Sequence, residues 1–156
     1  MYRWLLIFCV VLLGAKTVQA ADAPQRNIGL CIVATGKYNG LAQGLIESAR
    51  RYFCTQHHVT YFVFTDGDMP EREDIVKVSQ ARLGWPFDTL KRFHIYEANK
   101  DLFAKMDYLF AVDADMLFVS SIGDEIFGDL VGTQHPAFIG KRGTYEKNKK
   151  SKAYVA

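Results

Sequence analysis

Short apolar segments alternate with one clearly amphipathic segment in the first half of the chain. Residues 28–34 and 59–65 are apolar runs rich in β-branched side chains, which is typical of buried strands. Between them, apolar positions recur at three- and four-residue steps and predict one face of a helix over 41–53, namely Leu41, Leu45, Ile46, Ala49 and Phe53. Strand, helix and strand in this order predict a βαβ unit and a parallel sheet with right-handed crossovers.

The pattern continues less regularly further along the chain. Pro86 fits the first turn of a helix that carries Leu90, Phe93, Tyr96 and Glu97, because that turn needs no amide donor. The other expected elements are a short strand at 75–78, a buried strand at 108–112, an extended piece at 116–119, a short helix at 122–130 and a last strand at 137–139.

The first twenty residues read as a targeting segment and not as part of the core. Arg3 precedes ten apolar residues at 4–13, and Val18-Gln19-Ala20 supplies the small-x-small pattern of a cleavage site. We therefore expect a signal peptide at 1–20 and a folded part at 21–156. The apolar run is shorter than the roughly 20 residues that span a bilayer, so an uncleaved signal anchor is the second choice. Either alternative places the protein in the secretory pathway, in the Golgi lumen or secreted, with membrane association through 4–13 if the signal is uncleaved.

The charge and the cysteine content bear on the partners of the protein and on its disulfide bonds. The chain of 156 residues has 19 basic and 17 acidic side chains, and Arg3 and Lys16 lie in the signal, so the mature part is near neutral. Residues 141–156 are lysine-rich, which is typical of a solvated end, and no nucleic-acid partner is expected. Cys9 lies in the signal. One disulfide between Cys31 and Cys54 is open to the protein, but two buried thiols are the preferred interpretation.

Two carboxylates directly follow the apolar run 108–112. Asp113 and Asp115 are two residues apart, so in an extended backbone they point to the same side, at the point where the strand leaves the sheet. Mg²⁺ and Mn²⁺ prefer oxygen ligands, and they commonly complete their shell with waters and substrate phosphates. The pair therefore indicates a cation site for a diphosphate, although two solvated aspartates at a strand end would look the same in the sequence.

Three strand ends are expected to share one edge of the parallel sheet: the loop at 35–38, the turn at 66–68, and the aspartate pair. A nucleotide could lie across them, with its base against Tyr38 and its phosphates near the metal. Lys91 and Arg92 are candidates to neutralise a diphosphate. The alternatives are a core role for Tyr38, plain turn roles for the acids at 66–68, and a solvated helix face for the two cations.

Other catalytic motifs do not account for the chain. His57 and His58 are adjacent and His135 has no partner at a ligand spacing, so a zinc site is not expected. A phosphatase of the haloacid dehalogenase type also places Asp-x-Asp after an apolar strand. That class would need the pair near the start of the domain and a Thr or Val soon after it, whereas Leu117 and Phe118 follow here.

Several collinear segments resemble glycosyltransferase family 6, the retaining family that contains the histo-blood-group ABO transferases and α-1,3-galactosyltransferase. They cover about residues 27–156 and are Ile28-Gly29-Leu30, Ala34-Thr35-Gly36-Lys37-Tyr38, Tyr61-Phe62-Val63-Phe64-Thr65-Asp66, Trp85 with Thr89 and Arg92, Asp107-Tyr108-Leu109, Val112-Asp113-Ala114-Asp115-Met116, Gly132-Thr133-Gln134-His135-Pro136, Thr144-Tyr145-Glu146 and Ala153-Tyr154-Val155.

The resemblance implies an α/β, Rossmann-like nucleotide-diphospho-sugar transferase fold of the GT-A type, truncated at its carboxyl end. It implies a UDP-sugar donor, a glycan acceptor with a terminal galactoside, and Mn²⁺ on Asp113 and Asp115, with Mg²⁺ as the alternative. The implied donor-binding residues are Val33, Thr35, Tyr38, Trp85, Thr89, Arg92, Asp113 and Asp115, and the implied acceptor-binding residues are His135 and Thr144.

Departures from the family pattern qualify this expectation. Val33 stands where an aromatic residue is usual, and Lys91 stands where arginine can occur, which predicts weaker base stacking. The family's catalytic carboxylate lies beyond the position of Ala156, so no catalytic residue is assigned. The expected function is transfer of galactose or N-acetylgalactosamine from a UDP-sugar with retention. The alternative is a truncated, catalytically inactive fragment that binds nucleotide sugars.

Overall fold

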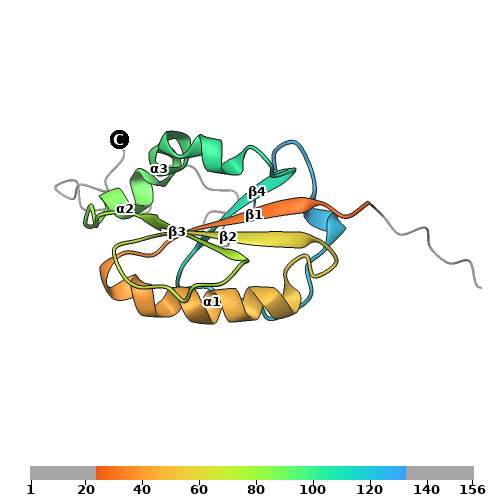
Figure 1. Cartoon of the computed structure of the whole chain (residues 1–156), viewed down its shortest axis with the longest axis horizontal. Helices are drawn as coiled ribbons and strands as arrows, with labels where there is room; N and C mark the ends of the chain where they lie inside the picture. Colours follow the sequence, from red (N-terminus) through yellow and green to blue (C-terminus); the bar gives the residue numbers. More distant parts are fainter. Residues whose placement is uncertain (1–23, 133–156) are drawn as a thin grey trace, which may run out of the picture.

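The computed structural model describes residues 24–132, which form a four-stranded sheet with helices on both faces (Figure 1). The strand order is β3-β2-β1-β4, and every neighbouring pair is parallel. The strands are β1 (Asn27–Val33), β2 (His58–Thr65), β3 (Ile75–Ser79) and β4 (Tyr108–Asp113). The predicted parallel α/β architecture is confirmed, and each predicted strand in the described range lies within a residue or two of its expected position.

Helix α1 (Asn39–Tyr52) covers one face of the sheet (Figure 1). Its buried stripe is Ala42, Leu45, Ile46 and Ala49, with spacings of three and four residues. The prediction was wrong for Leu41, which is 45% exposed. Leu41 lies one position outside this stripe in the first turn, and Ala42 takes the inward place instead. The helix packs on Ile28, Leu30, Ile32 and Val63 of the two central strands.

The opposite face is covered by α2 (Phe87–Leu90), α3 (Arg92–Ala98) and the 3-10 helix η2 (Lys100–Phe103). One continuous helix was expected here, but the structure has a break at Lys91. Arg92 supplies a physical reason, since its Nε donates a hydrogen bond to the carbonyl oxygen of Thr89 at 3.1 Å. A side-chain donor thus engages a carbonyl that an uninterrupted helix would pair with a backbone amide. Pro86 stands just before α2.

The strand β4 was expected to be buried, and it is instead an edge of the described sheet. Side chains along it alternate between half-buried and exposed, and Leu109 is 47% exposed. In the described sheet β4 pairs with β1 alone. The buried aromatic cluster under α3 consists of Cys31, Phe62, Phe64, Ile95 and Phe103 and includes no residue of β4. Edge strands show this alternation because only one face and one side are packed.

The segment after β4 departs most from expectation. Residues 122–130 form only the 3-10 turn η3 (Asp124–Ile126) in place of the expected helix. Residues 116–119, expected as an extended piece, belong to neither a helix nor a strand. The backbone of Gly123 is non-helical, with φ −137° and ψ −140°, and its amide is held by the Glu125 carboxylate at 2.9 Å. Ile122 forms a single parallel bridge to Phe53. The strand expected at 137–139 lies outside the described residues.

Both cysteines of the folded part are buried and free, so the two-thiol interpretation is confirmed and a disulfide between them is excluded. Burial raises the pKa of the Cys31 thiol to about 12 and that of Cys54 to about 11. Residues 24–132 contain no helix that is long and apolar enough to cross a membrane. The predicted signal segment at 1–20 lies outside the described residues.

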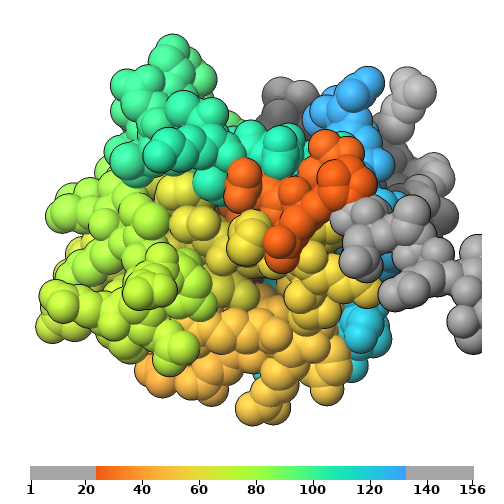
Figure 2. All heavy atoms as spheres, turned by 45° about the vertical axis from the view of Figure 1, so that its right-hand side comes forward, coloured from red at the N-terminus to blue at the C-terminus, as the bar shows by residue number. Residues whose placement is uncertain are grey.

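The beginnings of the strands gather at one end of the sheet. Figure 2 shows the red-orange start of β1 beside the yellow residues that lead into β2 and the teal residues that lead into β4. Backbone hydrogen bonds join these segments, from the amide of His58 to Arg26 at 2.9 Å and from the amide of Asp107 to Asn27 at 2.7 Å. Since the strands are parallel, their carboxyl ends must meet at the other end.

Candidate functional site

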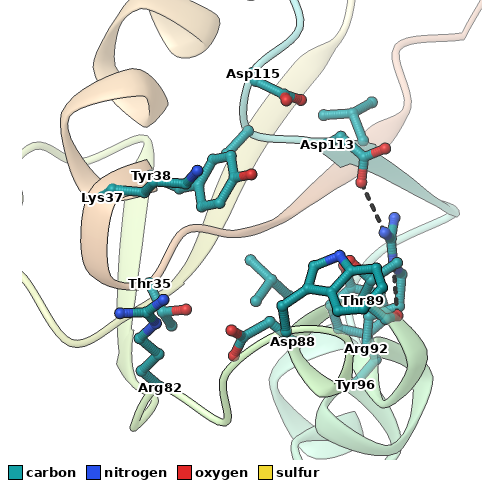
Figure 3. Close-up of a pocket in the computed structure, with 14 residues that line it drawn as sticks. Thr35, Lys37, Tyr38, Arg82, Asp88, Thr89, Arg92, Tyr96, Asp113 and Asp115 are labelled. Carbon is teal, nitrogen blue, oxygen red and sulfur yellow. Dashed lines mark hydrogen bonds and ion pairs between the residues drawn. The ribbon is translucent and has the colours of Figure 1, made fainter. Parts of the chain in front are cut away.

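The carboxyl ends of β1 and β4 border an open pocket of about 350 Å³, a size common for small-molecule sites (Figure 3). The segment after β3 and the helices α2 and α3 complete its wall. All of the predicted donor-binding residues line this pocket: Val33, Thr35, Tyr38, Trp85, Thr89, Arg92, Asp113 and Asp115. The structure therefore brings together side chains that are up to 82 positions apart in the chain, as the parallel topology predicts.

The two aspartates reach the pocket from the end of β4. Asp113 is its last residue and Asp115 follows in a turn, which the amide of Met116 closes on the carbonyl of Asp113 at 3.2 Å. Ala114 between them is only 4% exposed, so it anchors the turn on the core while both acids stay exposed. Figure 3 shows both carboxylates on the same side of the pocket.

This donor set fits a hard divalent cation. Within residues 24–132 no group of three or more His, Cys, Asp or Glu side chains is placed to hold a metal ion. A cation at Asp113 and Asp115 would therefore take its remaining ligands from water and from a bound anion. Mg²⁺ and Mn²⁺ commonly bind phosphates in this way, with one or two carboxylates from the protein.

Arg92 is the cation nearest to the aspartate pair. Its Nη2 lies 2.7 Å from Oδ1 of Asp113, while its Nε donates to the carbonyl of Thr89 at 3.1 Å, so two contacts fix the plane of the guanidinium (Figure 3). The Arg92 side chain is 20% exposed and that of Asp113 is 56% exposed, which leaves the carboxylate open to a further ligand. Lys91 does not line the pocket, and its Nζ lies 5.4 Å from the ring centre of Phe87.

The other end of the pocket is formed by the loop between β1 and α1, which includes the 3-10 turn η1 (Gly36–Tyr38). Thr35 is 3% exposed, whereas Tyr38 is 37% exposed and presents its ring to the pocket (Figure 3). The Nζ of Lys37 lies 5.1 Å from the centre of that ring. This end offers the aromatic face of Tyr38 for a planar ring, the buried Thr35, and two cations, Lys37 and Arg82.

The acids of the turn after β2 do not line the pocket. Asp68 is fully exposed and pairs with Lys77 at 3.3 Å. Asp66 instead accepts a hydrogen bond from the amide of Gly36 at 2.8 Å. The interpretation of both acids as turn residues therefore agrees with the structure, and Asp66 has an additional contact with the loop beside the pocket.

Six further residues line the pocket. Val112 and Ala114 flank Asp113, and the other four carry polar side chains that were missed in the sequence: Lys37, Arg82, Asp88 and Tyr96. Lys37 could have been found, because it adjoins Tyr38. Arg82 could not have been found in this way, because it follows β3 and reaches the pocket only through the course of the loop between β3 and α2 (Figure 3). Its side chain lies against Gly36. Asp88 accepts the amide of Leu83 at 2.8 Å and closes the loop at 83–88. Burial raises the pKa of Tyr96 above its usual range, so its hydroxyl stays protonated.

The predicted acceptor-binding residues, His135 and Thr144, lie outside the described residues.

The sequence of this chain is similar to a known protein family and to several characterised proteins. The family model for glycosyltransferase family 6 matches residues 16–156. The chain is 31% identical over 143 residues to globoside alpha-1,3-N-acetylgalactosaminyltransferase 1 of Homo sapiens, and 33% identical over 142 residues to histo-blood group ABO system transferase 1 of Rattus norvegicus. Each match covers 83% of this chain and 41% of the relative, so the chain spans about two-fifths of the length of these proteins.

These matches extend over the whole described sheet and pocket. The parallel sheet with helices on both faces is the Rossmann-like arrangement expected for such a glycosyltransferase. The family match, the level of identity to the two named relatives and the architecture agree, and the chain belongs to glycosyltransferase family 6.

Proposed function

We propose that this chain binds the UDP-sugar donor of a metal-dependent, retaining hexosyltransferase. The donor sugar would be galactose or N-acetylgalactosamine, and the acceptor a glycan that ends in a galactoside. The observation that supports this most directly is a single pocket with an aromatic, polar end at Thr35 and Tyr38 and an acidic end at Asp113 and Asp115. With a divalent cation held by the two aspartates, a nucleoside diphosphate matches this arrangement, because its planar base meets the aromatic end and its anionic diphosphate meets the cation.

The base end supports uracil binding by shape and chemistry. Tyr38 offers a ring face and a hydroxyl, and Thr35 lies beside it at the end of β1. A tyrosine stacks on any nucleobase, so selection of uracil would depend on hydrogen bonds within the loop after β1. Val33 cannot add a second aromatic face, which predicts modest affinity for the nucleoside alone.

The acidic end supports binding of the diphosphate through a cation. Bound Mn²⁺ would act as a Lewis acid on the diphosphate oxygens and so stabilise the charge that develops on UDP as the sugar leaves. Asp113 and Asp115 would hold the ion. Arg92 has N–H groups beyond its contacts with Asp113 and Thr89, and these are available to donor oxygens in the same pocket.

The names of the relatives support the choice of substrate class. They transfer N-acetylgalactosamine or act in the ABO blood-group system, and such transferases modify glycans. The apolar run at 4–13 supports a place in the secretory pathway, as a cleaved signal or an anchor, in the Golgi or outside the cell.

Calorimetry on the full chain tests the donor site. We expect UDP to bind more tightly in Mn²⁺ than in EDTA, and Asp113→Asn with Asp115→Asn to lower the affinity in Mn²⁺ at least about tenfold. The same double variant should not lower the affinity in EDTA, because it removes two negative charges and frees Arg92 from Asp113. The matched control is Asp101→Asn, an exposed carboxylate outside the pocket that should change neither value. Equal UDP affinity with and without Mn²⁺ in the unmodified chain would refute the metal site.

A second measurement separates transfer from binding alone. The full chain is incubated with Mn²⁺, UDP-galactose or UDP-N-acetylgalactosamine, and a galactoside acceptor, and the product is followed by mass spectrometry. An α-linked product supports the transferase. Donor binding without product in repeated assays would instead support the binding-only alternative for this 156-residue chain.

A further inference from the structure

One carboxylate oxygen ties the turn after β2 to the loop after β1. Oδ1 of Asp66 accepts hydrogen bonds from the backbone amide of Gly36 at 2.8 Å and from Nδ2 of Asn39 at 3.0 Å. The carbonyl oxygen of the Asn39 side chain accepts the hydroxyl proton of Thr65 at 2.9 Å, and the Thr65 oxygen accepts the amide of Gly67 at 3.0 Å. Two segments about 30 residues apart are thus joined by a continuous chain of hydrogen bonds.

The surroundings leave these groups little freedom. Thr65 is 1% exposed, and a Cβ added at Gly67 would lie 2.4 Å from Nδ2 of Asn39, so Asn39 packs directly on the turn. Gly36 has φ +59°, a conformation that other residues adopt at a cost, so its amide is aimed at Asp66 by an unusual backbone. The amide of Gly36 and the side chain of Asn39 draw the pKa of the Asp66 carboxyl below its usual value, so it stays ionised near neutral pH.

The loop held in this way is the base end of the pocket. Gly36 lies between Thr35 and Lys37, and both of these residues and Tyr38 line the pocket, whereas Asp66 does not. Asp113 and Asp115 reach the pocket from β4, a different strand, and the hydrogen bonds of Asp66 and Asn39 go instead to Gly36, to Thr65 and to each other. The hydrogen bonds of Asp66 therefore hold only the loop at the base end of the pocket, whereas the aspartates at the acidic end are positioned by β4.

We infer that Asp66, together with Asn39, is a positioning residue for the nucleoside part of the donor: it fixes the loop from Thr35 to Tyr38 in the conformation that presents Tyr38 to the base. This inference rests on the proposed donor site and adds to it a residue that touches neither the base nor the metal. A fixed loop raises affinity because less conformational freedom is lost when the ligand binds.

The experiment compares ligands that report on each end of the pocket. Calorimetry on the full chain measures the affinity for UMP, which needs the base end, and for pyrophosphate with Mn²⁺, which needs only the acidic end. We expect Asp66→Ala to lower UMP affinity about tenfold and to leave the affinity for Mn²⁺-pyrophosphate unchanged. Asp66→Asn keeps an acceptor oxygen for Gly36 and should restore most of the loss.

Two further variants complete the design. Asn39→Ala removes one of the two groups that donate hydrogen bonds to Asp66, so it should lower UMP affinity less than Asp66→Ala does. This variant keeps the positioning role testable if Asp66→Ala fails to fold. Asp68→Ala is the matched control, since Asp68 lies in the same turn but is fully exposed, does not line the pocket, and pairs with Lys77 at 3.3 Å. Hydrogen exchange should be faster at the amides of 36–38 in Asp66→Ala and unchanged in α3.

The results can distinguish failure of the positioning role from failure of the donor site. Unchanged UMP affinity in both Asp66→Ala and Asn39→Ala would overturn the positioning role while leaving the donor site in place. Equal losses for UMP and for Mn²⁺-pyrophosphate would also overturn it, because they would indicate a general disturbance of the fold. If the unmodified chain binds neither ligand, the proposed donor site itself fails, and the inference fails with it.

Discussion

Ion pairs of arginine have two different roles in this molecule. Arg92 meets Asp113 inside the pocket, where the carboxylate stays open to a ligand. Arg50 instead meets Asp74 in a two-pronged contact, with Nε at 2.7 Å and Nη2 at 2.9 Å from the two carboxylate oxygens, and its guanidinium also lies 5.5 Å from the ring centre of Tyr61. This second pair joins α1 to the residues that lead into β3 and is structural.

The pair between Arg50 and Asp74 predicts a dependence of stability on pH. The hydrogen bond from Arg50 holds the pKa of the Asp74 carboxyl below its ordinary value of 3.8. A depressed pKa contributes stability above the unfolded value, and this contribution is lost as the pH falls through the folded value. We expect Asp74→Asn to cost about 0.5–1 kcal/mol at about pH 6, because solvent screens the pair, and the difference to shrink below about pH 4.

Urea unfolding followed by circular dichroism at a series of pH values measures this difference. Asp68→Asn is the control, because Asp68 is fully exposed and its ion pair with Lys77 is screened by water, so the variant should show little effect at any pH. A cost for Asp74→Asn that stays constant down to about pH 2.5 would contradict the assignment of the effect to the charge of Asp74.

At the scale of the element, the contact between α1 and the sheet depends on a narrow stripe. Leu45 is fully buried against the central strands, whereas Leu41, one turn earlier, is 45% exposed. The two leucines have the same side chain on the same helix, and the main difference between them is burial, although Leu41 lies in the first turn. They therefore form a matched pair for measuring what the packing of this helix contributes.

Truncation of these two leucines should have unequal effects. We expect Leu45→Ala to lower the free energy of unfolding by about 2–5 kcal/mol, since it removes buried methyl groups and leaves a cavity. Leu41→Ala should cost less than about 1 kcal/mol, because its side chain already meets water. Chemical denaturation of both variants gives the comparison, and equal costs would show that the described position of α1 on the sheet is wrong.

At the scale of the whole molecule, the sheet separates two apolar clusters, and each contains one thiol. Cys54 belongs to the cluster under α1, while Cys31 belongs to the aromatic cluster under α3 with Phe62, Phe64 and Phe103. The rings of Phe62 and Phe103 pack edge to face, with their centres 4.9 Å apart and their planes at 87°. The two thiols are therefore separate natural probes of the two faces.

Thiol reactivity should report the integrity of each cluster. Burial raises the pKa of Cys31 to about 12 and that of Cys54 to about 11, so almost no reactive thiolate forms at about pH 8. We expect iodoacetamide to label both residues at least about a hundredfold more slowly in the folded protein than in urea. Peptide mapping by mass spectrometry assigns each label, and rapid labelling of only one thiol in the native chain would show that its cluster opens independently.

The local pattern of residues was enough for the strands and for most of α1. Apolar runs and helical spacing are local properties, and they reflect which side chains leave water whatever the partner is. The same patterns were insufficient where neighbours compete with local preference. The break at Lys91 depends on a side-chain donor from Arg92, and the loss of the helix after Ile122 depends on the Gly123 backbone and the Glu125 carboxylate.

The sequence by itself determined the chemical identity of the pocket: the aspartate pair after an apolar strand, the tyrosine after the first strand, and a parallel topology that places strand ends together. Only the tertiary structure decided which other side chains join them, including Arg82 and Asp88, and which acid holds a loop instead of facing the pocket. It also decided that β4 lies at the edge of the sheet formed by residues 24–132. The physical reason is that contacts between distant segments depend on the strand order and on the course of the loops, and neither is encoded in a local pattern.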